Sequence, residues 1–239
     1  MKPVLIVKLG STFPAIIARR GDFEDWIMQG LGFERDRFHL IRPAEGDSLP
    51  APDAYRAVFL TGSHSYVTDR EAWSLRTADW LPDVVRSEIP LVGICYGHQL
   101  LAEAMGGTAD FCPSGNEFGT VEIRMQETAR EDRLFQCFPP VTKVHASHSQ
   151  CVIKLPPTAR RLAANSHNQN QAFAIGSSAW GLQFHPEYDA DVVRGYIQES
   201  ADMLRQGGLD PEKLLQTVAE VDFGNLFFER MRHIILGQT

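Results

Sequence analysis

The stretch Pro-Leu-Val-Gly-Ile-Cys-Tyr-Gly-His-Gln at residues 90–99 is the most informative part of this sequence. An apolar run over 91–94 leads into Cys95, which has a glycine two positions away on either side, and helix-forming residues follow over 98–104. This pattern predicts a strand, a sharp turn and a helix, with the cysteine at the turn. Glycines permit the strained backbone of such an elbow, and the positive end of the following helix favours a thiolate. On this stretch alone, Cys95 is equally well explained as a nucleophile or as a buried structural cysteine.

A second stretch, Gly-Leu-Gln-Phe-His-Pro-Glu at residues 181–187, favours the catalytic interpretation of Cys95. A cysteine nucleophile needs a base, and that base needs a group that orients it. Pro186 holds the preceding His185 in extended backbone, where residues two apart point to the same side. The Glu187 carboxylate can therefore reach the imidazole and stabilise its charged form. The two stretches together predict a Cys95–His185–Glu187 triad.

Taken together, these stretches closely resemble the class I, triad-type glutamine amidotransferases. The resemblance is greatest to the amidotransferase domain of GMP synthase and its free-standing relatives, and it covers about residues 1–205 in motif order. It implies that Cys95 is the nucleophile and that His185 acts as general base and then general acid. It also implies that Glu187 orients the imidazole.

Composition and charge favour a globular enzyme over a nucleic-acid-binding or membrane protein. The 239 residues are 44% apolar and 22% charged, which suits one large α/β domain. The formal net charge of −7 argues against a nucleic-acid-binding surface. There is no run of 18 apolar residues, so we expect no membrane span. Residues 1–8 are charged too early to be a signal peptide and are expected to form a buried strand.

The other three cysteines, Cys112, Cys137 and Cys151, do not have the spacing of a zinc site, and we expect them to be structural. Because a nucleophilic thiol needs a reducing compartment, a cytoplasmic location is expected. The sequence contains neither a Walker A motif nor a G-x-G-x-x-G motif, so it offers no ATP site of its own. We accordingly expect no metal and no cofactor.

Strands and helices alternate in the first half of the sequence. We expect strands over 4–9, 38–41, 57–60 and 91–94, and helices over 22–28 and 71–87, the second interrupted by Pro82. This alternation predicts an α/β fold with a mostly parallel central sheet and helices on both faces, which is flavodoxin-like. Functional sites in such sheets form at the carboxyl ends of the strands, where Cys95 and the loop 61–65 fall.

The second half changes to short strands and a helical tail. Strands are expected over 121–124, 143–145, 161–163, 171–175 and 180–184, and a helix over 189–205. We therefore predict one domain over 1–205 and a C-terminal helical extension over 206–239 that packs on it. The apolar positions expected to make that packing are Leu214, Leu215, Val218 and Val221. A docking surface for another chain remains the alternative.

Backbone N–H groups usually stabilise the oxyanion of such a reaction, and Tyr96, directly after the nucleophile, supplies one of them. The second is expected from the loop that follows the strand 57–60. The family has Gly-Gly-Pro there, whereas this chain has Gly62, Ser63 and His64. Ser63 is therefore either the second oxyanion donor or an ordinary turn residue.

The resemblance also implies the residues that bind substrate: Gln99, the backbone of Ser149 and Gln150, and Gly62 of the oxyanion loop. Ser149 and Gln150 stand where the family has glycine and aspartate. The missing acid implies that the ammonium group of free glutamine is not recognised in the usual way. For the neighbouring His148, packing within the loop and direct contact with substrate are both open.

Three functions follow from these residues. The first is a GMP synthase-like glutamine amidotransferase that hydrolyses the γ-carboxamide of glutamine through a cysteinyl thioester and passes ammonia to a separate synthetase subunit. The second is a stand-alone γ-glutamyl peptide or amide hydrolase, which uses the same chemistry and needs no partner. The third is a catalytically idle regulatory or binding protein, against which the intact triad argues.

Overall fold

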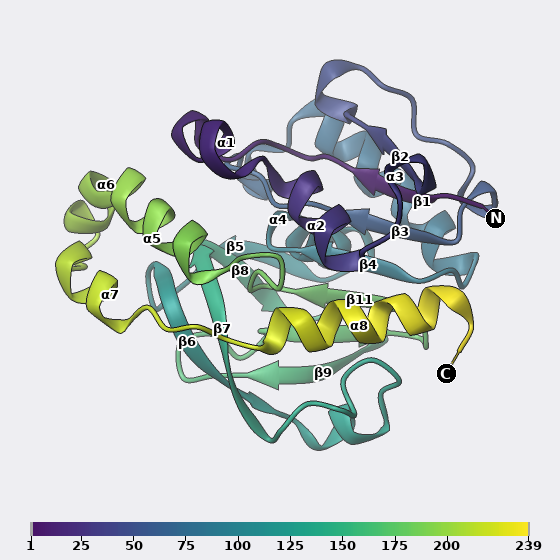
Figure 1. The fold of residues 1–239 in the computed structure, drawn as a ribbon. Coiled ribbons are helices and arrows are strands. Elements are labelled where there is room, and N and C mark those ends of the chain that lie inside the picture. Colours follow the sequence, from purple (N-terminus) through teal and green to yellow (C-terminus); the bar gives the residue numbers. More distant parts are fainter. Residues whose placement is uncertain (1, 239) are drawn as a thin grey trace.

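The computed structural model describes residues 2–238, and within them nine strands form one central sheet (Figure 1). Five neighbouring strands are parallel, in the order β2 (Phe38–Ile41), β1 (Val4–Val7), β3 (Ala57–Leu60), β4 (Leu91–Ile94) and β11 (Ala179–Leu182). The sheet continues through the antiparallel strands β10 (Ala172–Ile175), β9 (Ala159–Ala164), β6 (Glu117–Met125) and β7 (Val141–His148). The predicted parallel core is confirmed, and the short strands of the second half extend it.

Helices cover both faces of the sheet: α2 (Phe23–Leu31) and α8 (Phe223–Leu236) lie on one face, and α3 (Ala72–Arg86) and α4 (Tyr96–Ala104) on the other (Figure 1). Val4 and Ile6 of β1 are buried in the cluster that includes α2 and α8. Leu5 and Val7 of the same strand are buried in the cluster that includes α3 and α4. Because side chains alternate along a strand, a run of four apolar residues fills both layers at once.

A third group of helices surrounds the carboxyl-end edge of the sheet: α1 (Pro14–Arg20), α5 (Ala190–Glu199), α6 (Ala201–Gln206) and α7 (Pro211–Thr217). Their shared cluster includes Ile16, Tyr196 and Leu204. A small antiparallel sheet of β5 (Thr108–Phe111) and β8 (Gln150–Lys154) lies apart from the central one. Strand β8 follows β7 almost directly, so the turn at Ser149 joins the two sheets.

The C-terminal tail packs on the body of the protein. Val218 is buried, and Leu214 and Leu215 are partly buried, against the cluster formed with α5. Phe227 and Met231 of α8 are fully buried in the cluster under the central sheet. These contacts favour packing over docking for Leu214, Leu215 and Val218, whereas Val221 is half-buried and is not part of this cluster. The domain boundary at residue 205 remains a prediction.

Several boundaries differ from the predicted ones. Helix α3 runs through Pro82 without a break. Proline there costs about 3 kcal/mol, whereas burying Leu81 and Val84 contributes roughly as much or more. The helix expected over 189–205 is two helices that meet at Ser200. Helix α1 was not among the expected helices; Pro14 lies in its first turn, where its missing N–H costs nothing.

Among residues 2–238, no helix combines the length and the apolar character needed to cross a membrane.

Candidate active site

The nucleophile elbow is present and strained at the predicted residue. Cys95 follows β4 directly and has φ +50° and ψ −100°, in the left-handed half of backbone space that non-glycine residues rarely enter. A Cβ on Gly97 would lie 2.6 Å from the Cβ of Leu60, and one on Gly93 would collide with the carbonyl of Gly97. Both flanking glycines are therefore required, because the helix turns back tightly onto the strands.

The predicted base and its orienting acid meet at the neighbouring strand. Strand β11 pairs in parallel with β4, with Leu182 opposite Ile94, so both strands end at the same edge of the sheet. His185 follows β11, and its backbone N–H donates to the carbonyl of His145 at 2.8 Å. Its Nδ1 lies 2.7 Å from Oε1 of Glu187, the partner that the His-Pro-Glu spacing predicts.

Burial and charge act in opposite directions on the imidazole. His185 is 3% exposed, and this burial by itself would lower its pKa. The charge of Glu187 and the contact with Cys95 outweigh burial and raise the pKa of His185 to about 10. The imidazole is therefore an imidazolium at neutral pH. A protonated His185 beside Cys95 is the arrangement that stabilises a thiolate and can protonate a leaving amine.

An aromatic stack holds the imidazole in place, and sequence reasoning missed it. The ring of Tyr188 stacks on His185 with 3.9 Å between ring centroids, and Phe23 stacks more loosely at 6.2 Å. Tyr188 follows Glu187 directly, so a search of the residues around the His-Pro-Glu motif could have found it. Phe23 comes from the start of α2, and no local signal links it to the site.

Gln183 is a second group that sequence reasoning did not assign to the site. Its side chain is fully buried, and its Nε2 lies 3.7 Å from Sγ of Cys95. Its Oε1 accepts from Nε2 of Gln99 at 3.2 Å. The amide thus points a donor at the sulfur, which suits a thiolate better than a thiol.

The predicted oxyanion loop lies beside the elbow. Tyr96 begins α4, and its side chain is turned away into the core, where its hydroxyl donates to Ser74 at 2.7 Å. Its backbone N–H is left for a ligand because it lies in the first turn of a helix. Ser63 lines the cleft, and its Oγ accepts from the N–H of Ser65 at 3.1 Å. Gly62 is buried behind His185 and is not among the residues that line the cleft.

The residues expected to bind the glutamyl group lie on the other side of Cys95. Gln99, Ser149 and Gln150 all line the cleft. Nε2 of Gln99 donates to the carbonyl of Gln150 at 2.8 Å. The Gln150 side chain is held by the loop after β3: its Oε1 accepts from the N–H of Val67 at 3.1 Å and its Nε2 donates to Thr68 at 2.6 Å. The side chain that replaces the family's aspartate is thus directed into this loop.

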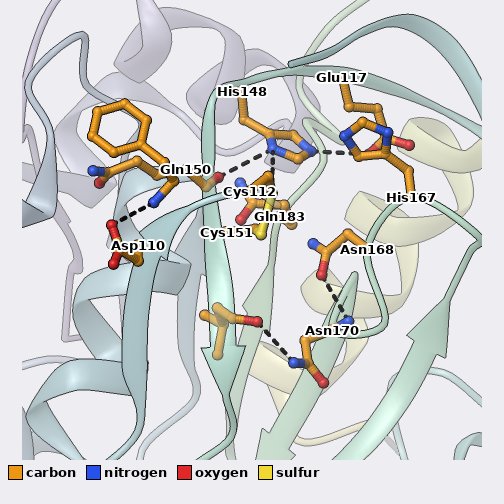
Figure 2. The surroundings of a disulfide bond; sticks show 12 residues. Asp110, Cys112, Glu117, His148, Gln150, Cys151, His167, Asn168, Asn170 and Gln183 are labelled. Carbon is orange, nitrogen blue, oxygen red and sulfur yellow. Dashed lines mark hydrogen bonds and ion pairs between the residues drawn. A yellow bond between two sulfur atoms is a disulfide. The ribbon is translucent and has the colours of Figure 1, made fainter. Parts of the chain in front are cut away.

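His148 belongs to a buried network under this segment (Figure 2). Its Nε2 lies 3.0 Å from Glu117 and its Nδ1 3.1 Å from the carbonyl of Gln150. Glu117 also accepts from Asn165 and Gln171, each at 2.6 Å. Burial would raise the pKa of Glu117, but these hydrogen bonds outweigh it and lower that pKa below its usual range. These contacts favour loop bonding as the role of His148.

A disulfide joins the same segment to β5. Cys112 and Cys151 are bonded, and Sγ of Cys112 lies 4.0 Å from Nδ1 of His148 (Figure 2). Both cysteines are structural, as expected, but their pairing was not predicted, since spacing along the chain does not reveal it. Cys95 and Cys137 are free.

The cleft is lined mainly by aromatic, serine and histidine side chains. Its empty volume is about 710 Å³, and none of the described residues that line it is Asp, Glu, Lys or Arg. One side is a row of rings, Tyr188, Tyr196, Phe13 and His64, which we call the aromatic wall. Successive centroids along it lie 4.9, 5.3 and 4.5 Å apart. Within residues 2–238, no group of three or more acidic, histidine or cysteine side chains is arranged to hold a metal.

The C-terminal helix supports the triad from behind. Phe223, at the start of α8, packs edge-on against Phe184, the residue before His185, with 5.0 Å between ring centroids. Any side chain on the next residue, Gly224, would collide with the carbonyl oxygen of Pro186. The start of α8 therefore fixes the backbone of the His-Pro-Glu loop.

The family model described as glutamine amidotransferase class-I matches residues 47–198, which include the whole triad. A GMP synthase (glutamine-hydrolysing) of Porphyromonas gingivalis is 34% identical over 133 residues, which make up 55% of this chain and 25% of that protein. Gamma-glutamyl peptidase 4 of Arabidopsis thaliana is 25% identical over 201 residues, which make up 82% of this chain and 78% of that protein. The chain thus spans about a quarter of the GMP synthase.

Among solved structures, a glutamine amidotransferase from Thermotoga maritima matches 98% of this chain and 99% of its own, with a TM-score of 0.78 and 22% identity. This likeness confirms the fold.

Proposed function

The chain belongs to the class I glutamine amidotransferase family, and from this premise we propose that it cleaves a γ-glutamyl carboxamide through a thioester on Cys95. The observation that carries the proposal is the meeting of a strained cysteine with a buried, charged His185–Glu187 pair at one edge of the sheet. An idle binding protein would have no use for a pair that costs stability to bury.

The reaction begins with attack of the Cys95 sulfur on the γ-carbonyl carbon. The N–H groups of Tyr96 and Ser63 stabilise the oxyanion that forms. The C–N bond then breaks, and His185 gives its proton to the departing amine. Water attacks the γ-glutamyl thioester, and His185 takes a proton from that water. The products are a free amine, or ammonia from glutamine, and glutamate.

Two substrate classes fit this chemistry. Glutamine is the substrate that the GMP synthase relative suggests, and its ammonia would pass to a separate synthetase subunit. The γ-glutamyl peptide or amide hydrolase is favoured by a specific observation: the side chain of Gln150, at the family's acidic position, is bound to Val67 and Thr68. The match to gamma-glutamyl peptidase 4 over 82% of the chain supports the second class.

We also propose that the protein works in the cytoplasm, because Cys95 must remain a free thiol. The Cys112–Cys151 bond, which is more typical of oxidising compartments, is the observation against this location.

The test is release of glutamate from L-glutamine and from γ-glutamyl dipeptides, with Cys95→Ser as the control. Folding of the variant is checked by circular dichroism. We expect turnover of at least one of these substrates by the native protein and none by the variant. Turnover by a folded Cys95→Ser protein would overturn the proposal. Stimulation by an added synthetase would favour the amidotransferase. Full activity without a synthetase would favour the hydrolase.

A further inference from the structure

The aromatic wall extends outward from the catalytic imidazole. His185 stacks on Tyr188 at 3.9 Å, and the remaining rings of the wall follow in contact with one another. The inner two rings are buried, with Tyr188 5% and Tyr196 3% exposed, whereas Phe13 is half-buried and His64 is exposed. The wall therefore leads from the reacting centre to the open side of the cleft.

The position of the acid shows which part of the substrate faces this wall. In the proposed reaction His185 protonates the departing nitrogen, so that nitrogen must lie within hydrogen-bonding reach of the imidazole. In the proposed binding mode the glutamyl end would lie toward Gln99 and the turn at Ser149, which also line the cleft. Any group carried by the amide nitrogen is therefore directed along the aromatic wall.

The chemistry of the wall limits what that group can be. None of the described lining residues is an acid, a lysine or an arginine, and the charge of His185 is already paired with Glu187 at the inner end of the wall. A carboxylate or ammonium group placed on the outer rings would therefore lose water without gaining an ionic partner. Desolvation beside Phe13 and Tyr196 lowers the pKa of His64, although much of this residue is open to solvent. His64 is accordingly neutral at physiological pH. Phe118 and Met203 add further apolar surface to the cleft.

We propose that the aromatic wall is a leaving-group subsite, and that the preferred substrate is the γ-glutamyl amide of an amine that carries an uncharged aromatic ring. This inference rests on the proposed function. The ring of the substrate would pack against the half-buried Phe13, which itself meets Tyr196 edge-on. Free glutamine would leave the subsite unused.

The step is balanced without any further reagent. The C–N bond of the amide breaks as the bond from Cys95 sulfur to the carbonyl carbon forms, and the proton of His185 goes to nitrogen. The arylalkyl amine leaves uncharged and takes up a proton from solvent. One water molecule then cleaves the thioester to give glutamate and restores Cys95 and His185.

The experiment compares kcat/KM for four γ-glutamyl compounds: the benzylamide, the methylamide, γ-glutamylglycine and the amide of 1,4-diaminobutane. In the order given, these compounds would place an aromatic ring, a methyl group, a carboxylate and an ammonium group against the aromatic wall. We expect the benzylamide to exceed each of the others by at least tenfold, the size of effect that one well-packed aromatic contact gives.

Phe13→Ala provides the second measurement, with Ile17→Ala as the matched control. Ile17 lies on the neighbouring helix α1, is 38% exposed and does not line the cleft. We expect Phe13→Ala to lower kcat/KM for the benzylamide about tenfold more than for the methylamide, and Ile17→Ala to change neither.

The outcomes separate this inference from the function on which it rests. Turnover of the methylamide with no preference for the benzylamide would overturn the subsite and leave the proposed function standing. A preference for the glycine or diaminobutane compound would also overturn it. Turnover of no γ-glutamyl compound, glutamine included, would overturn both.

Discussion

Replacing Glu187 by glutamine removes the charge behind the catalytic imidazole while nearly keeping its shape. The pKa of His185, raised from 6.5 to about 10, corresponds to about 5 kcal/mol in favour of the imidazolium. Glu187 is the strongest of the groups that raise it, and Cys95 supplies the rest. Losing the carboxylate should therefore remove about half, about 2 to 3 kcal/mol. The result is a fall of roughly 30- to 150-fold in kcat/KM.

The pH profile separates this electrostatic effect from a loss of structure. Because folding raises the pKa of His185, the imidazolium contributes stability to the folded protein that is fully present below about pH 6.5 and is lost as the pH rises toward 10. The same deprotonation removes the catalytic acid. The alkaline limb of kcat/KM should therefore lie near pH 10 and move down to roughly pH 8 in Glu187→Gln.

The assay is glutamate release between pH 6 and pH 10.5, with Glu131→Gln as the control. Glu131 is exposed and does not line the cleft, so its replacement removes one charge away from the triad. A folded Glu187→Gln protein with less than threefold loss and an unmoved alkaline limb would refute the assigned role of Glu187.

Three further changes probe other parts of the structure. His185→Ala should cost more than Glu187→Gln, at least about a thousandfold in kcat, because base and acid are lost together; steady-state glutamate release checks this, and a loss below tenfold would contradict the triad. Gly224→Ala should lower the free energy of unfolding by about 1 to 3 kcal/mol and also reduce kcat, because the new methyl group displaces α8 or the His-Pro-Glu loop. Urea unfolding and turnover measure the two effects, and wild-type values for both would disprove the close contact. Replacing Cys112 and Cys151 by alanine should lower the free energy of unfolding by about 4 kcal/mol, because their bond closes a loop with a sequence separation of 39 residues. Thermal unfolding with and without reductant checks this, and equal stability of the variant and the oxidised wild type would contradict it.

The parallel core could be predicted because its signals are local. Phe38–Ile41, Ala57–Leu60 and Leu91–Ile94 are short apolar runs bounded by turn residues, and the structure has strands at these residues. The helix over 22–28 was predicted from its acidic first turn, and the structure adds that Asp22 caps it rather than lying within it. The interruption expected at Pro82 was wrong, because the rule that proline breaks a helix takes no account of the burial of the neighbouring side chains.

The triad's residues could be predicted, and their surroundings could not. Cys95, His185 and Glu187 carry their chemistry in two short motifs, so their roles follow from residue type and spacing. Phe13 directly precedes α1 and Tyr196 lies in α5, so the two rings are far apart in the sequence and meet only in the folded chain. An aromatic residue in a sequence gives no sign of which rings it will contact, and for this reason the aromatic wall was not foreseen.

The support from the C-terminal helix was also invisible to sequence reasoning. The pattern of α8 shows one apolar face, which the structure buries. A glycine near a helix start is expected to destabilise the helix, yet the absence of a side chain at Gly224 allows the close contact with Pro186. Such a contact depends on how two elements approach, which no local pattern records.

In the proposed mechanism, Cys95 carries the γ-glutamyl group during turnover. The most direct measurement is intact-protein mass spectrometry after rapid acid quenching of the enzyme with a γ-glutamyl substrate, followed by peptide mapping. We predict a mass increase of one glutamyl group, located on the peptide that contains Cys95, and absent from Cys95→Ser. Substrate turnover with no such adduct, together with an active Cys95→Ser protein, would contradict the account.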